Sequence, residues 1–312
     1  MSSAIEVGTT AWRWDALATA ESLCTQAQAA EAMGFASFWL PENHFGKRGA
    51  IPAPLLSLAA VAGRTQRIRL GCTSYLLPIR HPLLAAEEVA VLDRLCEGRL
   101  ILGVGRGLSS TMFTAFGVSP ADKRKLFQAN LAIMRNAWGG GSIGTDENGA
   151  PIQLSPLPLQ QPSPPLWVAA FGPLALQQVA ALGLPYLASP VESLEQLAQN
   201  YQRYRLDVEA AGLPAVHTTP VMRTVFLTDD AAQADAVKVA LAHSMPTSSP
   251  HTPAAVDAWA LVGDCHYVRD KLAEYIDRLA LSHLIVRGGI PGVSEEQQLR
   301  SHAALLEVAA SL

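Results

Sequence analysis

Short apolar runs alternate with longer segments of helical periodicity along most of the chain, and this alternation restricts the fold more than any other feature. The runs are rich in branched residues and lack strict polar alternation, which is typical of strands buried on both faces. Eight of them are strand candidates: Ile5–Thr9, Ser37–Leu40, Ile68–Thr73, Leu100–Val104, Leu166–Ala170, Pro185–Ala188, Met222–Leu227 and His283–Arg287. A parallel sheet covered by helices is therefore expected.

Helical segments separate and follow these strands. They are Ala16–Met33, Pro54–Thr65, Leu83–Cys96, Lys123–Trp138, Pro173–Leu182, Ser193–Ala211, Ala231–His243, Val268–Ala280 and a final helix near Ser294–Ala310. Pro54 and Pro173 fit first helical turns, whereas Gly34, Gly183 and Gly212 fit helix ends. The pattern predicts an α/β protein with a (β/α)8 TIM barrel, and an open doubly wound sheet is the alternative.

The length allows one or two domains, and the strand count favours a single barrel domain over residues 1–312 with loop insertions. Two proline-rich excursions interrupt the alternation, at about residues 139–165 and 244–260. The first is predicted to be a long loop or hairpin outside the barrel. The second is either a mobile lid or a surface crossover.

Composition excludes several classes of protein. Only 16% of residues are charged, against about 25% in an average domain, and the net charge is −4 without runs of like charge. We therefore expect no nucleic-acid partner and no membrane partner. Cys24, Cys72, Cys96 and Cys265 are scattered singly, which predicts reduced thiols and no metal site. With no signal-peptide pattern and no long apolar segment, a cytoplasmic location is expected.

Polar residues follow three of the predicted strands, at the end where barrel enzymes place their chemistry. Glu42, Asn43 and His44 follow Ser37–Leu40, and the pair Thr73-Ser74 ends the next strand. Taken alone, a Glu and a His on a loop are more often solvated or capping groups than catalytic ones.

Glycines flank Arg106 after the fourth strand, in the run Gly103-Val104-Gly105-Arg106-Gly107. The spacing fails the dinucleotide fingerprint, which needs its third glycine three residues after the second. Glycines on either side would nevertheless let the guanidinium and nearby N–H groups approach a phosphate.

Two longer stretches carry a family resemblance: residues 31–45 (EAMGFASFWLPENHF) and residues 63–117. The second contains Leu-Pro-x-x-His-Pro (Leu77–Pro82), Glu-Gly-Arg (Glu97–Arg99) and the Gly-Val-Gly-Arg-Gly run. With weaker matches in residues 166–184, 222–230 and 262–292, the chain is similar over nearly its whole length to the bacterial luciferase-like monooxygenase family.

This resemblance implies a barrel that binds FMN at the carboxyl ends of its strands, with reduced FMN supplied by a separate flavin reductase. Reduced flavin and dioxygen would form a flavin hydroperoxide that oxygenates a small-molecule substrate. Some relatives instead use a deazaflavin for hydride transfer. The family also implies a homodimer formed through the helices after the second and third strands, and Pro54–Ala62 is apolar on nearly every face.

The resemblance also implies roles for individual residues. Arg106 matches a phosphate-binding arginine, with Arg124 as a second basic residue near that phosphate. Thr73-Ser74 matches a pair beneath the flavin ring, where the luciferases have a cis non-proline peptide bond. Glu42 is expected among the cofactor-binding residues.

Two positions depart from the luciferase pattern. Phe171-Gly172 falls where luciferases carry Glu-Ser, so a phosphate contact there would come from backbone N–H groups of the helix after Pro173. Asn43 replaces the catalytic imidazole, and only the second histidine, His44, remains. An amide hydrogen-bonds but exchanges no proton at neutral pH, so light emission is not expected.

We expect Asn43 to hold a flavin or peroxide oxygen, and His44 to be either catalytic or structural. Trp12 and Trp14 are candidates for the wall of an apolar substrate pocket or for core packing. Three functions stay open: an FMN-dependent monooxygenase, a deazaflavin-dependent oxidoreductase, and a flavin-binding barrel with little catalysis.

Overall fold

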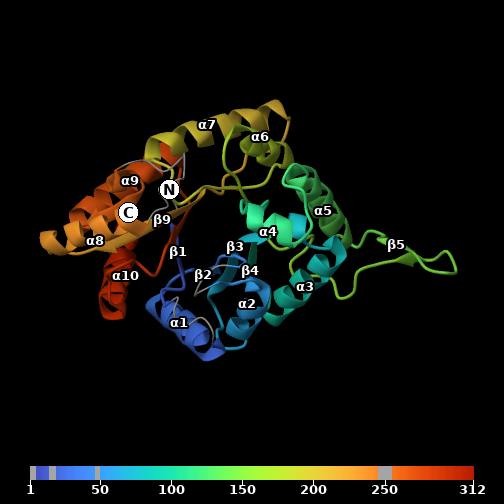
Figure 1. Ribbon diagram of the computed structural model, residues 1–312, viewed down its shortest axis with the longest axis horizontal. Helices are drawn as coiled ribbons and strands as arrows, with labels where there is room; N and C mark the ends of the chain where they lie inside the picture. Colours follow the sequence, from blue (N-terminus) through green and yellow to red (C-terminus); the bar gives the residue numbers. More distant parts are fainter. Residues whose placement is uncertain (1–4, 14–18, 46–49, 245–254) are drawn as a thin grey trace. The chain divides into compact units, whose positions relative to one another are not determined.

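The computed structural model describes residues 5–13, 19–45, 50–244 and 255–312 (Figure 1). Trp14 and residues 245–254 of the second excursion lie outside the described residues. The chain divides into two compact units. Unit 1 comprises Met1–Trp14, Gln26–Trp39 and Ala170–Leu312, and unit 2 comprises Asp15–Thr25 and Leu40–Ala169.

Unit 1 contains parallel strands in the order β10-β9-β11-β1-β2, with β8 in contact with β9. The strands are β1 (Glu6–Thr10), β2 (Ser37–Leu40), β8 (Tyr186–Leu187), β9 (Pro220–Leu227), β10 (Ala260–Gly263) and β11 (His283–Val286). The helices are α6 (Pro173–Leu182), α7 (Leu194–Ala210), α8 (Ala231–Ser244), α9 (Cys265–Leu279) and α10 (Glu295–Ala310), with α1 (Ala20–Met33) having residues in both units.

Unit 2 contains the parallel strands β3 (Arg69–Leu76), β4 (Leu100–Gly105) and β7 (Leu166–Ala169), in the order β3-β4-β7. Its helices are α2 (Pro54–Ala62), α3 (Pro82–Leu95), α4 (Ser110–Ala115) and α5 (Lys123–Trp138). After α5 an antiparallel hairpin of β5 (Gly144–Thr145) and β6 (Pro151–Ile152) extends away from α3 and α5 (Figure 1). The predicted loop or hairpin at residues 139–165 is thus a hairpin.

Local signals account for many helix ends. Pro54 and Pro173 lie in the first turns of α2 and α6, as predicted, and Gly183 ends α6 in the left-handed conformation with φ 62°. Ser294 and Gln297 form a capping box at the start of α10. Caps fix where helices begin and end without any long-range contact.

All eight predicted strands are present, with ends displaced by three residues or fewer. The α/β class is therefore confirmed in each unit. The second excursion was predicted to run to Ala260, but Ala260–Gly263 forms β10, which pairs with β9. This strand was missed because four residues after a proline-rich segment give too little periodicity to separate a strand from a loop.

Cys24, Cys72 and Cys96 are buried, Cys265 is exposed, and all four are free thiols. Trp12 packs in unit 1, where its indole Nε1 donates to Glu295 Oε1 at 3.1 Å and its ring meets His302 edge-on. Of the two roles considered for Trp12, the structure shows core packing, since the residue is only 6% exposed.

His302 is a buried imidazole on α10, packed edge-on against Phe35 as well as Trp12. Its Nε2 lies 2.9 Å from Gln298 Nε2, and neither His302 Nδ1 nor Gln298 Oε1 has a partner among the described residues. Burial lowers the pKa of His302 to about 4, from an ordinary value of 6.5. Folding therefore favours the neutral ring.

We predict that His302→Phe reduces the acid sensitivity of the protein. Since the pKa of His302 is lower in the folded state, the unfolded state binds more protons between pH 6.5 and about 4, so stability falls as pH falls through that window. The imidazole should contribute a loss of about 2 kcal/mol in unfolding free energy between pH 7 and pH 5. Urea unfolding at pH 7 and at pH 5 measures this change in unfolding free energy. His266→Gln, at an exposed position on α9, is the control, and an unchanged pH dependence in His302→Phe would contradict the prediction.

Candidate functional site

Glu42 is a buried carboxylate that joins the segment after β2 to the end of β3. Its side chain has no exposed surface. Oε1 accepts from Arg80 Nη1 at 2.7 Å, and Oε2 accepts from the Leu76 backbone N–H at 3.0 Å. Arg80 also donates to the Leu76 carbonyl at 2.8 Å. A charged pair with these additional hydrogen bonds is a stable way to bury a carboxylate.

Arg80 is itself fixed from two sides. Its guanidinium lies 3.9 Å from the centre of the Tyr75 ring, and the Tyr75 hydroxyl donates to Glu88 Oε2 at 2.7 Å. The Asn130 side-chain amide on α5 donates to the carbonyls of Leu77 and Arg80, at 2.9 and 3.1 Å. None of these residues was predicted for the site, although Arg80 is one of the unspecified positions inside the Leu-Pro-x-x-His-Pro motif.

His44 is oriented by Glu42. Its Nε2 lies 2.6 Å from Glu42 Oε1, so with a carboxylate as partner this nitrogen is assigned as the donor. The ring meets Phe116 edge-on at 5.1 Å between centroids. Nδ1 has no hydrogen-bond partner within the described part of the chain.

Asn43 has a different environment from its neighbour. It is exposed, and its Oδ1 accepts from the Ile51 backbone N–H at 2.6 Å while its own N–H donates to the Ile51 carbonyl at 3.1 Å. Both contacts close the segment between residues 43 and 51. The amide oxygen is therefore already engaged, and its NH2 group is the part of the side chain left for a ligand.

The Thr73–Ser74 peptide bond is cis, as the resemblance implies. Thr73 Oγ1 is buried without a hydrogen-bond partner among the described residues. Ser74 Oγ occupies the space that a Cβ at position 105 would need, so Gly105 lets β3 and β4 approach at this point. A buried hydroxyl without a partner is costly and marks a place where a ligand atom can complete the hydrogen bond.

Arg106 and Arg124 place two like charges near each other at the carboxyl end of β4. Arg106 is 8% exposed, its Nη2 donates to the Ala169 carbonyl at 2.9 Å, and its guanidinium lies 5.5 Å from the centre of the Phe127 ring. Burial and, second, the neighbouring Arg124 guanidinium lower the pKa of Arg106 to about 10. An anion bound between them would offset both effects.

Phe171 and Gly172 belong to unit 1, whereas the other predicted site residues belong to unit 2. Gly172 precedes α6 with φ 80°, and its carbonyl accepts from the N–H groups of Ala175 and Leu176, both at 3.1 Å. Pro173 supplies no N–H and α6 has no side-chain cap, so the predicted phosphate contact through backbone N–H groups stays a prediction.

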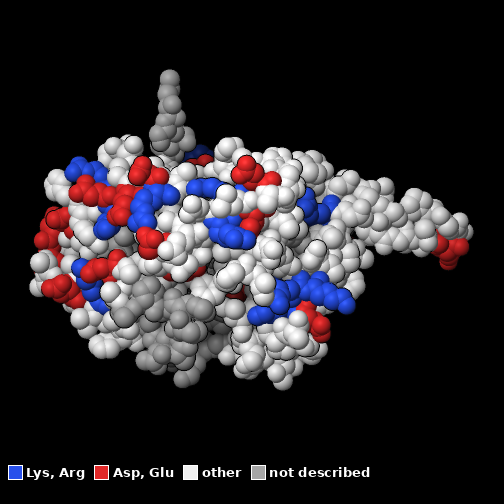
Figure 2. All heavy atoms as spheres, turned by 90° about the horizontal axis from the view of Figure 1, so that it is seen from above, with Lys and Arg blue, Asp and Glu red and all other residues white. Residues whose placement is uncertain are grey.

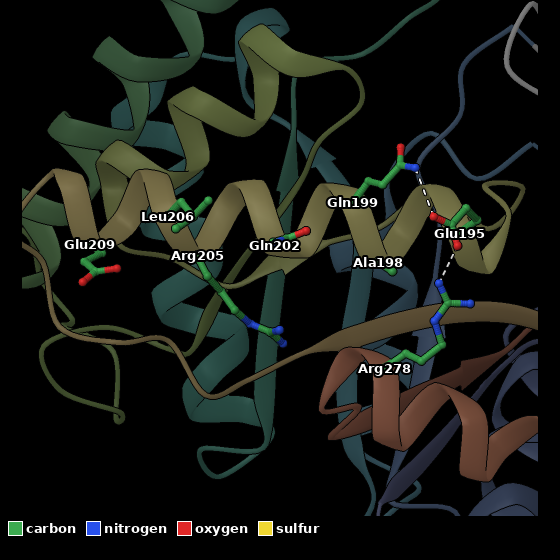
Figure 3. A pocket seen from close by; sticks show the side chains of 8 residues that line it. All are labelled: Glu195, Ala198, Gln199, Gln202, Arg205, Leu206, Glu209 and Arg278. Carbon is green, nitrogen blue, oxygen red and sulfur yellow. Dashed lines mark hydrogen bonds and ion pairs between the residues drawn. The ribbon is translucent and has the colours of Figure 1, made fainter.

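Each unit has a surface groove. One, of about 440 Å³, is lined by α7 and α9 in unit 1, where Arg278 pairs with Glu195 and Gln199 donates to the same carboxylate (Figure 3). The other, of about 510 Å³, lies between the start of α3 and α5 in unit 2. No residue of the predicted site lines either groove.

Charge on the described surface is mixed. Basic and acidic side chains are interspersed over the face shown in Figure 2. Among the described residues, no helix has the length and apolar character needed to cross a membrane, and no group of three His, Cys, Asp or Glu side chains is arranged to hold a metal ion. The expectation of no nucleic-acid partner stays a prediction.

Comparison with known proteins adds independent information. The model of the luciferase-like monooxygenase family matches residues 5–282. An uncharacterized protein, y4wF, of Sinorhizobium fredii is 38% identical over 164 residues, which are 51% of this chain and 47% of that protein. The alkanal monooxygenase alpha chain of the Kryptophanaron alfredi symbiont is 30% identical over 165 residues, 52% of this chain and 46% of that one. The chain thus spans about half the length of the curated relatives it matches.

Solved structures show the same fold along the whole chain. The oxygenating constituent of 3,6-diketocamphane monooxygenase from Pseudomonas putida, a type II Baeyer-Villiger monooxygenase in complex with FMN, has a TM-score of 0.81 at 19% identity, covering 99% of both chains. A coenzyme F420-dependent tetrahydromethanopterin reductase from Methanopyrus kandleri has a TM-score of 0.76 at 16% identity, covering 98% of this chain and 100% of that one. Since the family model covers most of the chain, we conclude that this protein belongs to the luciferase-like monooxygenase family.

Proposed function

We propose that this chain is an FMN-dependent monooxygenase that uses reduced flavin and dioxygen to oxygenate a small organic substrate. The observation that carries the proposal is the pair of guanidinium groups at Arg106 and Arg124, because two adjacent like charges, one of them buried, call for a bound anion such as the FMN phosphate. Family membership and the FMN in the diketocamphane monooxygenase complex support the same cofactor.

The residues present fit the cofactor. Arg106 and Arg124 would hold the phosphate, and the unpartnered hydroxyl of Thr73 beside Ser74 would hydrogen-bond the flavin. The predicted contribution of Phe171 and Gly172, which belong to unit 1, stays a prediction. When bound, reduced FMN supplies the two electrons with which one atom of dioxygen enters the substrate and the other becomes water.

His44 and Asn43 would have different roles in the reaction. His44, held at Nε2 by Glu42, would move a proton at Nδ1, whereas Asn43 would donate its amide N–H to an oxygen atom of a bound group. Both Glu42 oxygens already accept hydrogen bonds from the protein, which favours a positioning role through His44 and Arg80 over direct cofactor contact.

We further propose that the βα units of residues 1–312 form one (β/α)8 barrel and that a separate flavin reductase supplies reduced FMN. A homodimer through α2 and α3 is proposed as well. It is supported by large apolar side chains exposed on these helices, among them Leu56 at 75% and Leu95 at 57%. Sedimentation velocity should show a dimer, and Leu56→Glu should shift it toward the monomer.

The runner-up functions are a deazaflavin-dependent oxidoreductase, favoured by the fold shared with the F420-dependent reductase, and a flavin-binding barrel with little catalysis, favoured by Asn43. Titration of the purified protein with FMN, reduced FMN and F420 separates them. Saturable binding of reduced FMN supports the proposal. Binding of F420 alone contradicts it, and binding of FMN with no oxygenated product from any of a panel of ketones, aldehydes and alkenes favours the third function.

We predict that Arg106→Ala weakens FMN binding by about 1.5–3 kcal/mol, roughly 10- to 150-fold in the dissociation constant, because it removes a charge-assisted hydrogen bond in a buried site. Fluorescence titration with FMN measures the change. Lys125→Ala removes an exposed charge next to Arg124 on the same helix and serves as the control for a general electrostatic effect. Equal losses in Arg106→Ala and Lys125→Ala would rule out the phosphate assignment.

We predict different kinetic effects for the two neighbouring loop residues. His44→Gln should lower kcat by about 100-fold or more, since a proton-transfer group is lost, with little change in FMN affinity. Asn43→Ala should mainly lower the ratio of oxygenated product to reduced FMN consumed. Single-turnover assays under dioxygen measure both quantities. If His44→Gln turns over as the wild type does, His44 is structural.

A further inference from the structure

Two arginines come from neighbouring strands of unit 1 and have opposite surroundings. Arg223 on β9 is fully buried, and each of its three guanidinium nitrogens donates at least one hydrogen bond. Its Nη2 donates to the Glu192 carbonyl at 2.7 Å, Nη1 donates to the carbonyls of Met222 and Ser189, and Nε donates to the Tyr275 hydroxyl on α9 at 2.8 Å. Arg223 thus fixes the loop after β8 and has a structural role.

Arg287 directly follows β11 and continues the ladder, because its backbone N–H donates to the Arg223 carbonyl at 2.8 Å. Arg223 lies opposite Val286 in the parallel register, so these two side chains share the face of the sheet that meets Tyr275 of α9. Since successive residues of an extended strand point to opposite faces, the Arg287 side chain projects from the other face.

That other face is the one that carries Gly8, Ser37 and Trp39. Gly8 pairs with Ile285 in one direction and with Ser37 in the other, and the Trp39 indole donates to Ser37 Oγ at 2.7 Å. Arg287 lies two residues beyond Ile285, toward the carboxyl ends of the strands, where enzymes of this class of fold bind their ligands.

The backbone beneath Arg287 is closely held. The Gly288 N–H donates to Thr10 Oγ1 at 2.9 Å. A Cβ at position 288 would come within 2.6 Å of the Ala11 carbonyl and 2.8 Å of Trp12 Cα. The backbone at residue 288 is therefore packed closely against the residues that follow β1. These contacts fix the position of the backbone from which the Arg287 side chain extends.

The guanidinium of Arg287 has no ion pair and no hydrogen bond with any described residue. Burial lowers its pKa, and no carboxylate among the described residues opposes the effect. Arg223 shows that the same unit satisfies a buried guanidinium when it is structural. A desolvated cation without a partner is expensive to fold and is typical of a binding residue.

We propose that Arg287 binds an anionic oxygen of the organic substrate, most simply a carboxylate, as a two-pronged hydrogen-bonding group. The planar guanidinium matches the two oxygens of a carboxylate. This inference rests on the proposed function, since it concerns the substrate of the same enzyme. A phosphate would also match this group, but the proposed function assigns the FMN phosphate to Arg106 and Arg124.

Calorimetric titration with benzoate, with benzamide as its neutral counterpart, tests the proposal on the full chain. The wild type should bind benzoate more tightly than benzamide. Arg287→Gln should weaken benzoate binding by about tenfold or more while leaving FMN affinity unchanged. Arg300→Gln, which removes an exposed charge on α10, is the control and should bind benzoate as the wild type does.

Arg287→Lys keeps the charge and loses the planar group, so it should bind benzoate less tightly than the wild type and more tightly than Arg287→Gln. If Arg287→Gln does not fold, Arg287→Lys serves as the test variant instead.

Equal benzoate affinity in the wild type and the variants, or no benzoate binding at tens of millimolar, would overturn the proposal. A tenfold loss of FMN affinity in Arg287→Gln would overturn it as well, in favour of a phosphate site. Binding of F420 alone, without binding of reduced FMN, would contradict the proposed function while leaving the benzoate result intact.

Discussion

The arrangement of the candidate site depends on the buried carboxylate of Glu42. One side chain accepts hydrogen bonds from Arg80, from the Leu76 N–H at the end of β3 and from His44. Removing one partner of a buried charged pair typically costs about 3–5 kcal/mol, because the other charge is left uncompensated. Glu42 therefore has two roles. It stabilises the junction between the segment after β2 and the end of β3, and it fixes the orientation of the His44 ring.

Two arginine side chains lie in electrostatically unfavourable surroundings, and each of these positions suggests a bound ligand. Arg106 is buried beside Arg124, which lowers the pKa of Arg106. Arg287 is desolvated without any described partner. A bound anion would offset each effect, and we propose a phosphate at Arg106 and an oxygen of the substrate at Arg287. Arg223, whose three guanidinium nitrogens all donate to protein oxygens, shows the contrasting structural arrangement.

Much of the fold could be predicted from the sequence because its signals are local. Proline in the first turns of α2 and α6, glycine at the end of α6 and continuous apolar runs at the strands are all encoded within a few residues. The strand β10 was not predicted because it directly follows a proline-rich segment, and α4 was not predicted because six residues are too few to show helical periodicity.

The sequence by itself determined the family, the βα alternation, and the presence of Glu42, Asn43 and His44 on one loop and of Arg106 between glycines. Only the tertiary structure decided what the neighbours Asn43 and His44 do: Asn43 binds the backbone of Ile51, and His44 binds Glu42. It also showed that Arg80, which is 38 residues from Glu42 and was not predicted, donates a hydrogen bond to Glu42. Local patterns specify where strands and helices form, whereas hydrogen-bond partners distant in sequence are fixed by strand register and by which side chains must share a buried charge.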